Sequence, residues 1–450
     1  MKMMRLATAV AVAGWTAAQA AVSVTNVTVQ QRWPWNGKVD IDYEVSSDAP
    51  DDSIFVYPEA KENDRNIAIA PRTLTGDGVE PSMCGARVKP GRHRMTWHMD
   101  TDEPTLHSSS FTVTMHAVKG GMYLVVDLSG GPNAESYPIR YSDTPPDITD
   151  DACRTTNLWL RLCLPGTFMM GSPSDEYGRQ MFSSGVYDYS SSRSIGYETL
   201  HKVTLTKPFY IGVFEFTQRQ HALVKGQDYV TSSTYKGDLR PMVNINYNYL
   251  RGSVAGAAWP QHSQVDPNSF LGILRAKTGC LFDLPTEAQW EYACRAGTST
   301  ALNNGKNFTA SDVGPINEVA RAGDNNTTVV NGYTYQYQTV VGQYKPNAWG
   351  IYDMHGNVAE FCLDWWQSNL GSNVAIDPVG PQMGQEFYYK GYHYFRVIRG
   401  GSASASSSYM RTKENCRSAA RNLWSRGEPD DDYRNNYDVG FRVVATPVVQ

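Results

Sequence analysis

The sequence predicts two folded parts, an all-β module followed by a larger region of mixed strands and helices. In the first part, residues 39–45 alternate strictly between apolar and acidic side chains, the pattern of a strand with one face in water. In the second part, Thr217 and Thr286 are each followed three residues later by Gln, the spacing of a helix capping box. Residues 129–152, rich in Gly, Pro, Ser and Asp, are predicted to be the linker between the two parts.

The N-terminus predicts export. Lys2 and Arg5 precede a mostly apolar segment that ends near Ala18, and Ala18-Gln19-Ala20 fits small-x-small cleavage. Residues 1–20 are therefore interpreted as a signal peptide, and the mature protein as secreted or periplasmic. The alternative is a membrane anchor, but the apolar run is shorter than the ~20 residues that a span needs. No later stretch is long enough to span a membrane.

Composition excludes several classes of function. The chain of 450 residues is long enough for two or three domains. Its net charge of -5 gives no reason to expect nucleic acid as a partner. The seven cysteines include no C-x-x-C pair, which argues against a zinc ribbon or a thioredoxin-type site.

Residues 21–128 are predicted to form a small β-sandwich. Residues 95–99 and 111–115 repeat the alternation of 39–45, and turn-forming clusters at 75–78 and 90–91 separate such strands. Short alternating strands at this spacing favour an immunoglobulin-like or fibronectin-like sandwich. The module contains no catalytic constellation.

Strands and capped helices follow one another in the second part. Residues 201–206 are predicted to form a strand, and helices are predicted to begin after Thr217 and after Thr286, the latter with Trp290 facing the core. Residues 394–398 are interpreted as a buried strand. Gly400 and Gly401 then let the chain turn sharply or approach another group closely.

Three motifs in this part resemble one family. They are Leu284-Pro285-Thr286-Glu287-Ala288-Gln289-Trp290-Glu291-Tyr292-Ala293, Gly356-Asn357-Val358-Ala359-Glu360-Phe361 and Arg399-Gly400-Gly401-Ser402. Together they resemble the formylglycine-generating enzymes, also called sulfatase-modifying factors. The resemblance covers residues 153–450. It implies an α+β domain with a C-type-lectin-like fold, preceded here by the β-sandwich.

The resemblance breaks at the active site. In the family, R-G-G-S is followed by two cysteines whose thiolates bind copper(I) and activate oxygen against a substrate cysteine. This chain has Ala405 and Met410 at those two positions. A soft metal prefers thiolate ligands, so copper is not expected. Cys362 and Cys416 lie near the most family-like segments and are the suggested disulfide pair; the alternative is that all seven cysteines are small buried hydrophobes.

The family's G-N-V-W-E-W segment holds calcium, which prefers hard oxygen ligands. The resemblance therefore implies a calcium site formed by the side chains of Asn357 and Glu360 and the carbonyls of Gly356 and Val358. The alternative is a hydrogen-bonded turn without metal. His355, beside this segment, is interpreted as a packed loop residue.

Two kinds of function remain open. The first is an exported binding or scaffold protein whose groove, lined by Ser402, Ser404, Ser408, Tyr409 and Arg411, takes a peptide, protein or glycan. The second is an enzyme of the same superfamily, either with altered chemistry or generating formylglycine at a rearranged site. Whether a thiol, such as that of Cys416, reaches the groove distinguishes them. Glu198 and His201 are either a catalytic pair or a polar contact that holds a loop.

Overall fold

The structure is a computed structural model. It describes residues 22–32, 36–48, 54–63, 67–79, 84–106, 110–179, 198–226, 230, 232, 234–252, 264–323, 328–330, 333–335, 337–367, 369–381, 395–403, 413–425 and 437–447. Among these residues no helix is both long enough and apolar enough to cross a membrane.

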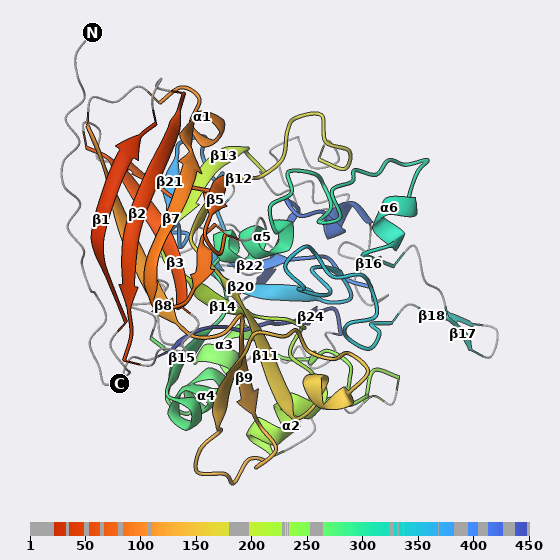
Figure 1. Cartoon of the computed structure of the whole chain (residues 1–450). Coiled ribbons are helices and arrows are strands. Elements are labelled where there is room, and N and C mark those ends of the chain that lie inside the picture. Colours follow the sequence, from red (N-terminus) through yellow and green to blue (C-terminus); the bar gives the residue numbers. More distant parts are fainter. Residues whose placement is uncertain are drawn as a thin grey trace.

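Two antiparallel sheets form the N-terminal part, which lies to one side in Figure 1. The first has the order β1-β2-β7-β5, with bounds Ser23–Gln31, Lys38–Ser46, Gly91–His98 and Leu74–Gly76. The second has the order β4-β3-β6, with β8 also paired to β3; the bounds are Ile67–Ile69, Ile54–Glu62, Ala86–Val88 and Phe111–Lys119. Helix α1, Met99–Asp102, follows β7. The predicted strands at 39–45, 95–99 and 111–115 correspond to β2, β7 and β8.

One apolar core joins these two sheets. The inward residues of β2 alternate with outward ones, and Val39, Ile41, Tyr43 and Val45 are all buried. They share a cluster with Trp97, which is fully buried, and with the inward residues of β3 and β8. The classification of this part as an immunoglobulin-like or fibronectin-like sandwich stays a prediction.

The second part is built on a six-stranded antiparallel sheet of order β10-β9-β11-β14-β25-β15. Its strands are Ile139–Ser142, Tyr123–Asp127, Asn157–Cys163, Phe209–Gly212, Val444–Pro447 and Cys280–Asp283. The predicted domain boundary at 128 and the linker at 129–152 differ from this arrangement. Strand β9 pairs with β11, and β10, inside the predicted linker, pairs with β9. The apolar run 122–126 is buried in the core of the second part, which explains why it belongs there.

Smaller sheets complete the second part. One has the order β12-β13-β21, with bounds Gly166–Met170, His201–Leu205 and Ala375–Ile376; another has the order β23-β22-β20-β24, with bounds Arg421–Ser425, Phe395–Arg399, Ala359–Trp365 and Val439–Gly440. Two-stranded pairs are β16-β19, Ala320–Arg321 with His355–Gly356, and β17-β18, Thr328–Val330 with Tyr333–Tyr335. The predicted strands at 201–206 and 394–398 are β13 and β22.

The helices lie around these sheets. They are α2 Gln218–Lys225, α3 Tyr247–Arg251, α4 Phe270–Thr278, α5 Glu287–Arg295 and α6 Gly314–Asn317, with 3-10 turns η1 Asp151–Arg154 and η3 Lys413–Cys416. Both predicted capping boxes are present. Thr217 and Gln220 close one at the start of α2, and Thr286 and Gln289 close the other at the start of α5. Trp290 of α5 is fully buried, as predicted.

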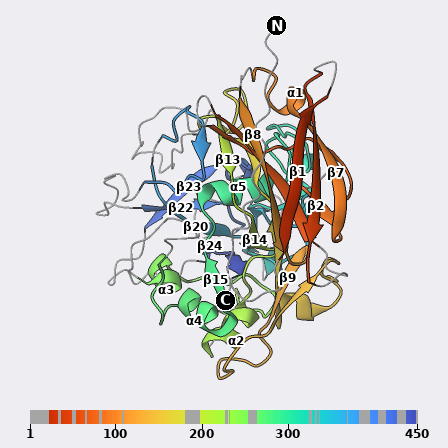
Figure 2. The ribbon, with the colours of Figure 1, turned by 60° about the vertical axis from the view of Figure 1, so that its left-hand side comes forward.

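The N-terminal sheets pack directly on the second part, as both views show (Figure 1, Figure 2). Phe55 and Tyr57 of β3 belong to the core cluster of the second part. Lys202 of β13 forms an ion pair with Glu103, and Tyr292 of α5 lies with its hydroxyl 3.6 Å from the Cys84 thiol. The junction between the two parts is therefore packed with side chains from both.

The N-terminus of helix α5 lies against a buried carboxyl group. The Glu287 amide donates to Asp364 Oδ2 at 2.7 Å, and Asp364 is buried. Burial, with the Glu287 charge adding to it, raises the pKa of Asp364 to about 7. A carboxyl whose pKa is higher in the folded state than in the unfolded chain stabilises the fold at low pH, and this contribution is lost as the pH rises through about 7.

We therefore expect Asp364→Asn to become more stable relative to the wild type as the pH rises from about 5 to 8. Urea unfolding of both proteins at several pH values measures this difference. The matched control is Asp175→Asn at an exposed position, for which the difference from the wild type should not change with pH. A constant difference for Asp364→Asn would show that Asp364 is ionised throughout this range.

Candidate functional site

The three family-like motifs come together around buried ion pairs. Arg399, at the end of β22, forms an ion pair with Glu291 of α5 and donates to the carbonyls of Ser418, Ala419 and Ala420 at 2.7–2.9 Å. Arg399 and Glu291 are both fully buried. This pairing fixes the strand that leads into Gly400, the helix α5 and the C-terminal segment relative to one another.

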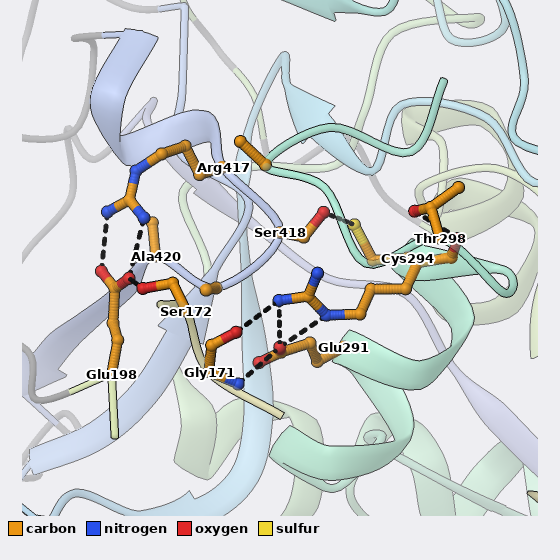
Figure 3. A network of polar contacts seen from close by, with 12 residues as sticks. Gly171, Ser172, Glu198, Glu291, Cys294, Thr298, Arg417, Ser418 and Ala420 are labelled. Atoms are coloured by element: carbon orange, nitrogen blue, oxygen red, sulfur yellow. Dashed lines mark hydrogen bonds and ion pairs between the residues drawn. The ribbon is translucent and has the colours of Figure 1, made fainter. Parts of the chain in front are cut away.

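A second buried pair lies beside the first, and Figure 3 shows this second pair with Glu291 nearby. Arg417 donates to both oxygens of Glu198 at 2.7–2.8 Å and to Glu176 at 2.6 Å, and Ser172 donates to Glu198 at 2.7 Å. Burial alone would raise the pKa of Glu198, but the Arg417 guanidinium holds it below its ordinary value. Glu198 is therefore a paired carboxylate.

Glu198 and His201 do not form a catalytic pair in this structure. The His201 Nδ1 donates to the Thr199 carbonyl at 2.8 Å, while Glu198 is directed at Arg417. Both side chains are buried. The contacts of Glu198 hold the Ser172 turn against the C-terminal segment, which agrees with the alternative that this region contains a loop-holding polar contact.

The chain turns at Gly400 and Gly401, as predicted. Their φ angles are +93° and +70°, in the region that favours glycine. A Cβ atom on Gly401 would lie 2.8 Å from the Cys416 sulfur and 2.9 Å from the Asn415 backbone. The Gly400 carbonyl accepts from the Gly356 amide at 2.7 Å, so the second and third motifs are in direct contact.

Only one residue of the predicted groove lies in the described part of the chain. Ser402 is 0% exposed, and its hydroxyl oxygen is buried with no hydrogen-bond partner among the described residues. This differs from the prediction that it lines an open groove, because the next residue, Ala403, is held inward by a 3.0 Å bond to the Asn357 carbonyl. The other predicted positions lie outside the described residues: Ser404, Ala405, Ser408, Tyr409, Met410 and Arg411.

All seven cysteines are described, and none of them forms a disulfide in the structure. The suggested Cys362–Cys416 disulfide is absent, and the two residues belong to different core clusters. Burial raises the pKa of Cys294 to about 12 and also raises the pKa of Cys362. Cys416 is 0% exposed and packs against Gly401. Except for Cys84, every cysteine is a buried side chain, close to the alternative of small buried hydrophobes.

His355 is a packed residue, as interpreted from the sequence. Its Nδ1 donates to the Cys416 carbonyl at 2.6 Å, and its Nε2 accepts from the Asn303 amide at 3.0 Å. Burial lowers its pKa to about 4, so the ring is neutral at physiological pH. The neutral ring links the second motif to the turn η3.

The side chains predicted to hold calcium are occupied by protein donors. Glu360 accepts from Arg442 at 2.7 Å on each oxygen and from the Trp290 indole at 2.7 Å. Asn357 Oδ1 accepts from the Thr339 amide at 2.8 Å, and its Nδ2 donates to Glu215 at 2.5 Å. As oriented here, the Glu360 carboxylate does not fit a calcium ligand because Arg442 already neutralises it.

Sequence reasoning missed two carboxyl groups near this motif. Glu215 is fully buried and accepts from the Val358 amide at 3.0 Å, and Asp353 accepts from the Gly342 amide at 2.6 Å. Burial raises the pKa of Glu215 well above its ordinary value and that of Asp353 to about 6. The available signal was an acidic residue between two aromatic ones, Phe214 and Phe216, in an otherwise apolar stretch.

Residues 146–447 match the family described as the sulfatase-modifying factor enzyme 1-like domain. This match covers more than half of the chain. The chain belongs to the sulfatase-modifying factor family. The resemblance carried by the three motifs is thereby confirmed, and so is a sheet-rich fold of this family.

Relatives of this chain include the formylglycine-generating enzymes of Streptomyces coelicolor and Bos taurus. The enzyme of Streptomyces coelicolor is 31% identical over 282 residues, which is 55% of this chain and 81% of that protein. The enzyme of Bos taurus is 31% identical over 172 residues, which is 36% of this chain. The chain spans only 38% of the length of that mammalian relative. Among solved structures, Treponema denticola variable protein 1 aligns with a TM-score of 0.42 and 22% identity, covering 65% of this chain and 96% of that one.

We expect Gly401→Ala to destabilise the fold by about 2–5 kcal/mol, because a positive φ and an overpacked contact each contribute. The control is Gly371→Ala, where φ is +75° but no atom lies within 4 Å of the added Cβ. That variant should lose only about 1–2 kcal/mol. Urea unfolding measures both. Equal losses would mean that the contact with Cys416 and Asn415 is not tight.

Proposed function

We propose that this protein is an exported binding protein on a sulfatase-modifying factor fold, without oxidase activity. The observation that carries the proposal is the position of the thiols. Ala405 and Met410 stand where the family has its copper ligands. The remaining cysteines give no substitute, because each is buried or, for Cys84, half-buried at the junction with the N-terminal sheets.

Burial also keeps these thiols in their unreactive protonated form. The thiolate is both the nucleophile and the metal ligand, and burial in apolar surroundings disfavours it. Burial raises the pKa of Cys153 to about 11 and that of Cys163 to about 12. Cys416, the nearest thiol to the turn in sequence, is enclosed against Gly401. These positions support binding over copper-dependent oxidation.

The ligand class follows from what remains in the loop after Gly401. Residues 402–411 consist of Ser, Ala, Tyr, Met and Arg, which supply hydroxyl groups, one aromatic ring and one cation. Such groups suit a peptide, protein or glycan surface. The signal peptide proposed for residues 1–20 supports a ligand outside the cytoplasm.

The runner-up function is an enzyme of the same family with altered chemistry. It is favoured by the buried ion pairs of Arg399, Arg417 and Arg442, because a surface loop that only binds a ligand does not need so extensive a buried support. In that case Cys416 would have to leave its buried position before it could react with a substrate cysteine.

We expect no conversion of a Cys-x-Pro-x-Arg peptide to the aldehyde when the purified full chain is incubated with copper(I) and oxygen. Mass spectrometry of the peptide measures the conversion, with copper alone as the background. Ala405→Cys/Met410→Cys is the matched variant, because it restores both thiols of the family pattern and should bind copper(I). Turnover by the wild type would overturn the binding proposal, and its loss in Cys416→Ser would assign the chemistry to Cys416.

We further propose that calcium binds beside the second motif, with Asp353 in place of Glu360 as the carboxylate. Asp353 Oδ1 is a buried oxygen without a hydrogen-bond partner among the described residues. Glu215, Asp353 and Glu360 together face one guanidinium, that of Arg442, so carboxyl groups outnumber cations here. In the described part of the chain no three His, Cys, Asp or Glu side chains form a metal cluster. Main-chain carbonyls, including those of Gly356 and Val358, would complete the set.

Calcium is expected to raise the melting temperature relative to EGTA, since a ligand at about 100 times its Kd stabilises the folded state by about 2.7 kcal/mol. Differential scanning fluorimetry with calcium, magnesium and EGTA measures the shift. Asp353→Ala should abolish it, and Asp175→Ala should not. If calcium has no effect on the wild type, Arg442 is the only cation that this carboxylate group needs.

A further inference from the structure

Two arginines of the second part lie together without a carboxylate partner. Arg321, in β16, is 9% exposed, and its Nε donates to the Tyr337 carbonyl at 3.0 Å. Arg240 is half-buried, and its Nη1 donates to the Thr234 carbonyl at 2.8 Å. Among the described residues neither guanidinium has an ion pair. Burial and the nearby Arg321 charge lower the pKa of Arg240.

Three tyrosines are in ring contact, and two of them lie on the segments bonded by these arginines. The Tyr235 ring stacks on the Tyr437 ring, with centroids 3.9 Å apart. The rings of Tyr235 and Tyr337 make an edge-to-face contact, with centroids 5.2 Å apart. A backbone hydrogen bond of 3.0 Å from the Val341 amide to the Leu239 carbonyl joins the segment that contains Tyr337 to the segment that contains Tyr235 and Arg240. We call Arg240, Arg321, Tyr235, Tyr337 and Tyr437 the arginine–tyrosine site.

The arginines of this site differ from the other buried arginines in the partners of their guanidinium groups. Most of these pair with carboxylates: Arg154 with Asp151, Arg251 with Asp283, Arg295 and Arg399 with Glu291, Arg417 with Glu198, Arg421 with Glu287, and Arg442 with Glu360. Arg161 and Arg396 lie against aromatic rings instead. A buried charge without compensation is costly, and among the described residues Arg321 has neither a carboxylate nor an aromatic ring as its partner. Arg240, which is half-buried, adds a second guanidinium without a carboxylate.

A second, independent observation lies next to Tyr337. Gln338 is 1% exposed, and both polar atoms of its amide are buried without a partner in the described part of the chain. Buried polar groups are normally hydrogen-bonded, and an unsatisfied one needs an explanation. Two guanidinium groups without a carboxylate and one unsatisfied amide therefore lie on segments that contact one another, and a bound polar group could compensate them.

We propose that the arginine–tyrosine site binds an oxyanion, a carboxylate, sulfate or phosphate group, of the ligand. Guanidinium groups match such groups with two parallel hydrogen bonds, and tyrosine rings pack on the carbon framework that carries the anion. This proposal rests on the binding function proposed above, because only that function makes the anion part of a ligand. It is also connected to the predicted groove, because Asn357 bonds both the Thr339 amide, at 2.8 Å, and the Ala403 amide, at 3.0 Å.

The test is a titration of the full chain with sodium sulfate, sodium phosphate and sodium acetate at constant ionic strength, set with sodium chloride. Near-ultraviolet circular dichroism of the tyrosines and calorimetry follow binding. We expect saturable binding of at least one of the three anions, and the anion that binds most tightly identifies the oxyanion. Arg240→Gln should weaken binding about tenfold, as expected for loss of a charge-assisted pair of hydrogen bonds.

Arg92→Gln is the matched control, because the Arg92 side chain is 86% exposed on the N-terminal sheets; its affinity should equal that of the wild type. Arg240→Lys keeps the positive charge but lacks the two parallel N–H donors of a guanidinium. Its affinity should lie between that of the wild type and that of Arg240→Gln. Non-saturating changes that are equal in all four proteins would overturn the proposal, since they mean an effect of salt on the whole surface. Turnover in the peptide assay would instead remove the binding function and leave a saturable anion site intact.

Discussion

The structure depends on pairing buried arginines with buried glutamates. Arg399–Glu291, Arg421–Glu287, Arg417–Glu198 and Arg442–Glu360 all join segments that are distant in the sequence, and every one of these side chains is buried. Moving a charge out of water costs several kcal/mol, and the loss is recovered only when the partner is well placed and the remaining donors are satisfied. Such pairs tolerate few alternative arrangements. They specify how the loops meet more than they add to the free energy of unfolding.

Helix α5 shows how this constraint positions the turn at Gly400. The capping box at Thr286 sets where the helix begins, and one face then presents Glu287 and Glu291 to the arginines of β22 and β23. With Arg399 held there, Gly400 and Gly401 have little freedom, and the close contact with Cys416 requires residues without a Cβ. Packing and hydrogen bonds thus hold the chain in place as far as Ala403.

The local elements could be predicted from the sequence, whereas their long-range partners could not. Alternation in β2 and the two capping boxes depend on neighbours within a few residues, so the pattern alone was sufficient. The membership of β9 in the second part was missed, because the apolar segment 122–126 gives no sign of which sheet it will join. The pairing of Glu198 with Arg417, 219 positions apart, likewise has no local signature. The family-like motifs identified the family but could not show that Arg442 pairs with the Glu360 carboxylate.

A frame in which charge is matched so consistently makes its unmatched groups informative. Selection for folding alone would favour replacing Arg321 by a neutral residue, because an unpaired buried guanidinium destabilises the folded state. The same holds for the unsatisfied amide of Gln338. Asn357 links both segments: its amide donates to the Arg321 carbonyl at 2.8 Å, and its Oδ1 accepts from the amide of Thr339, the residue after Gln338. The Asn357 carbonyl in turn accepts from the Ala403 amide. The buried frame, the replacement of the family's two cysteines by Ala405 and Met410, and a positive site linked through Asn357 to Ala403 together support the proposal that this protein binds an anionic ligand.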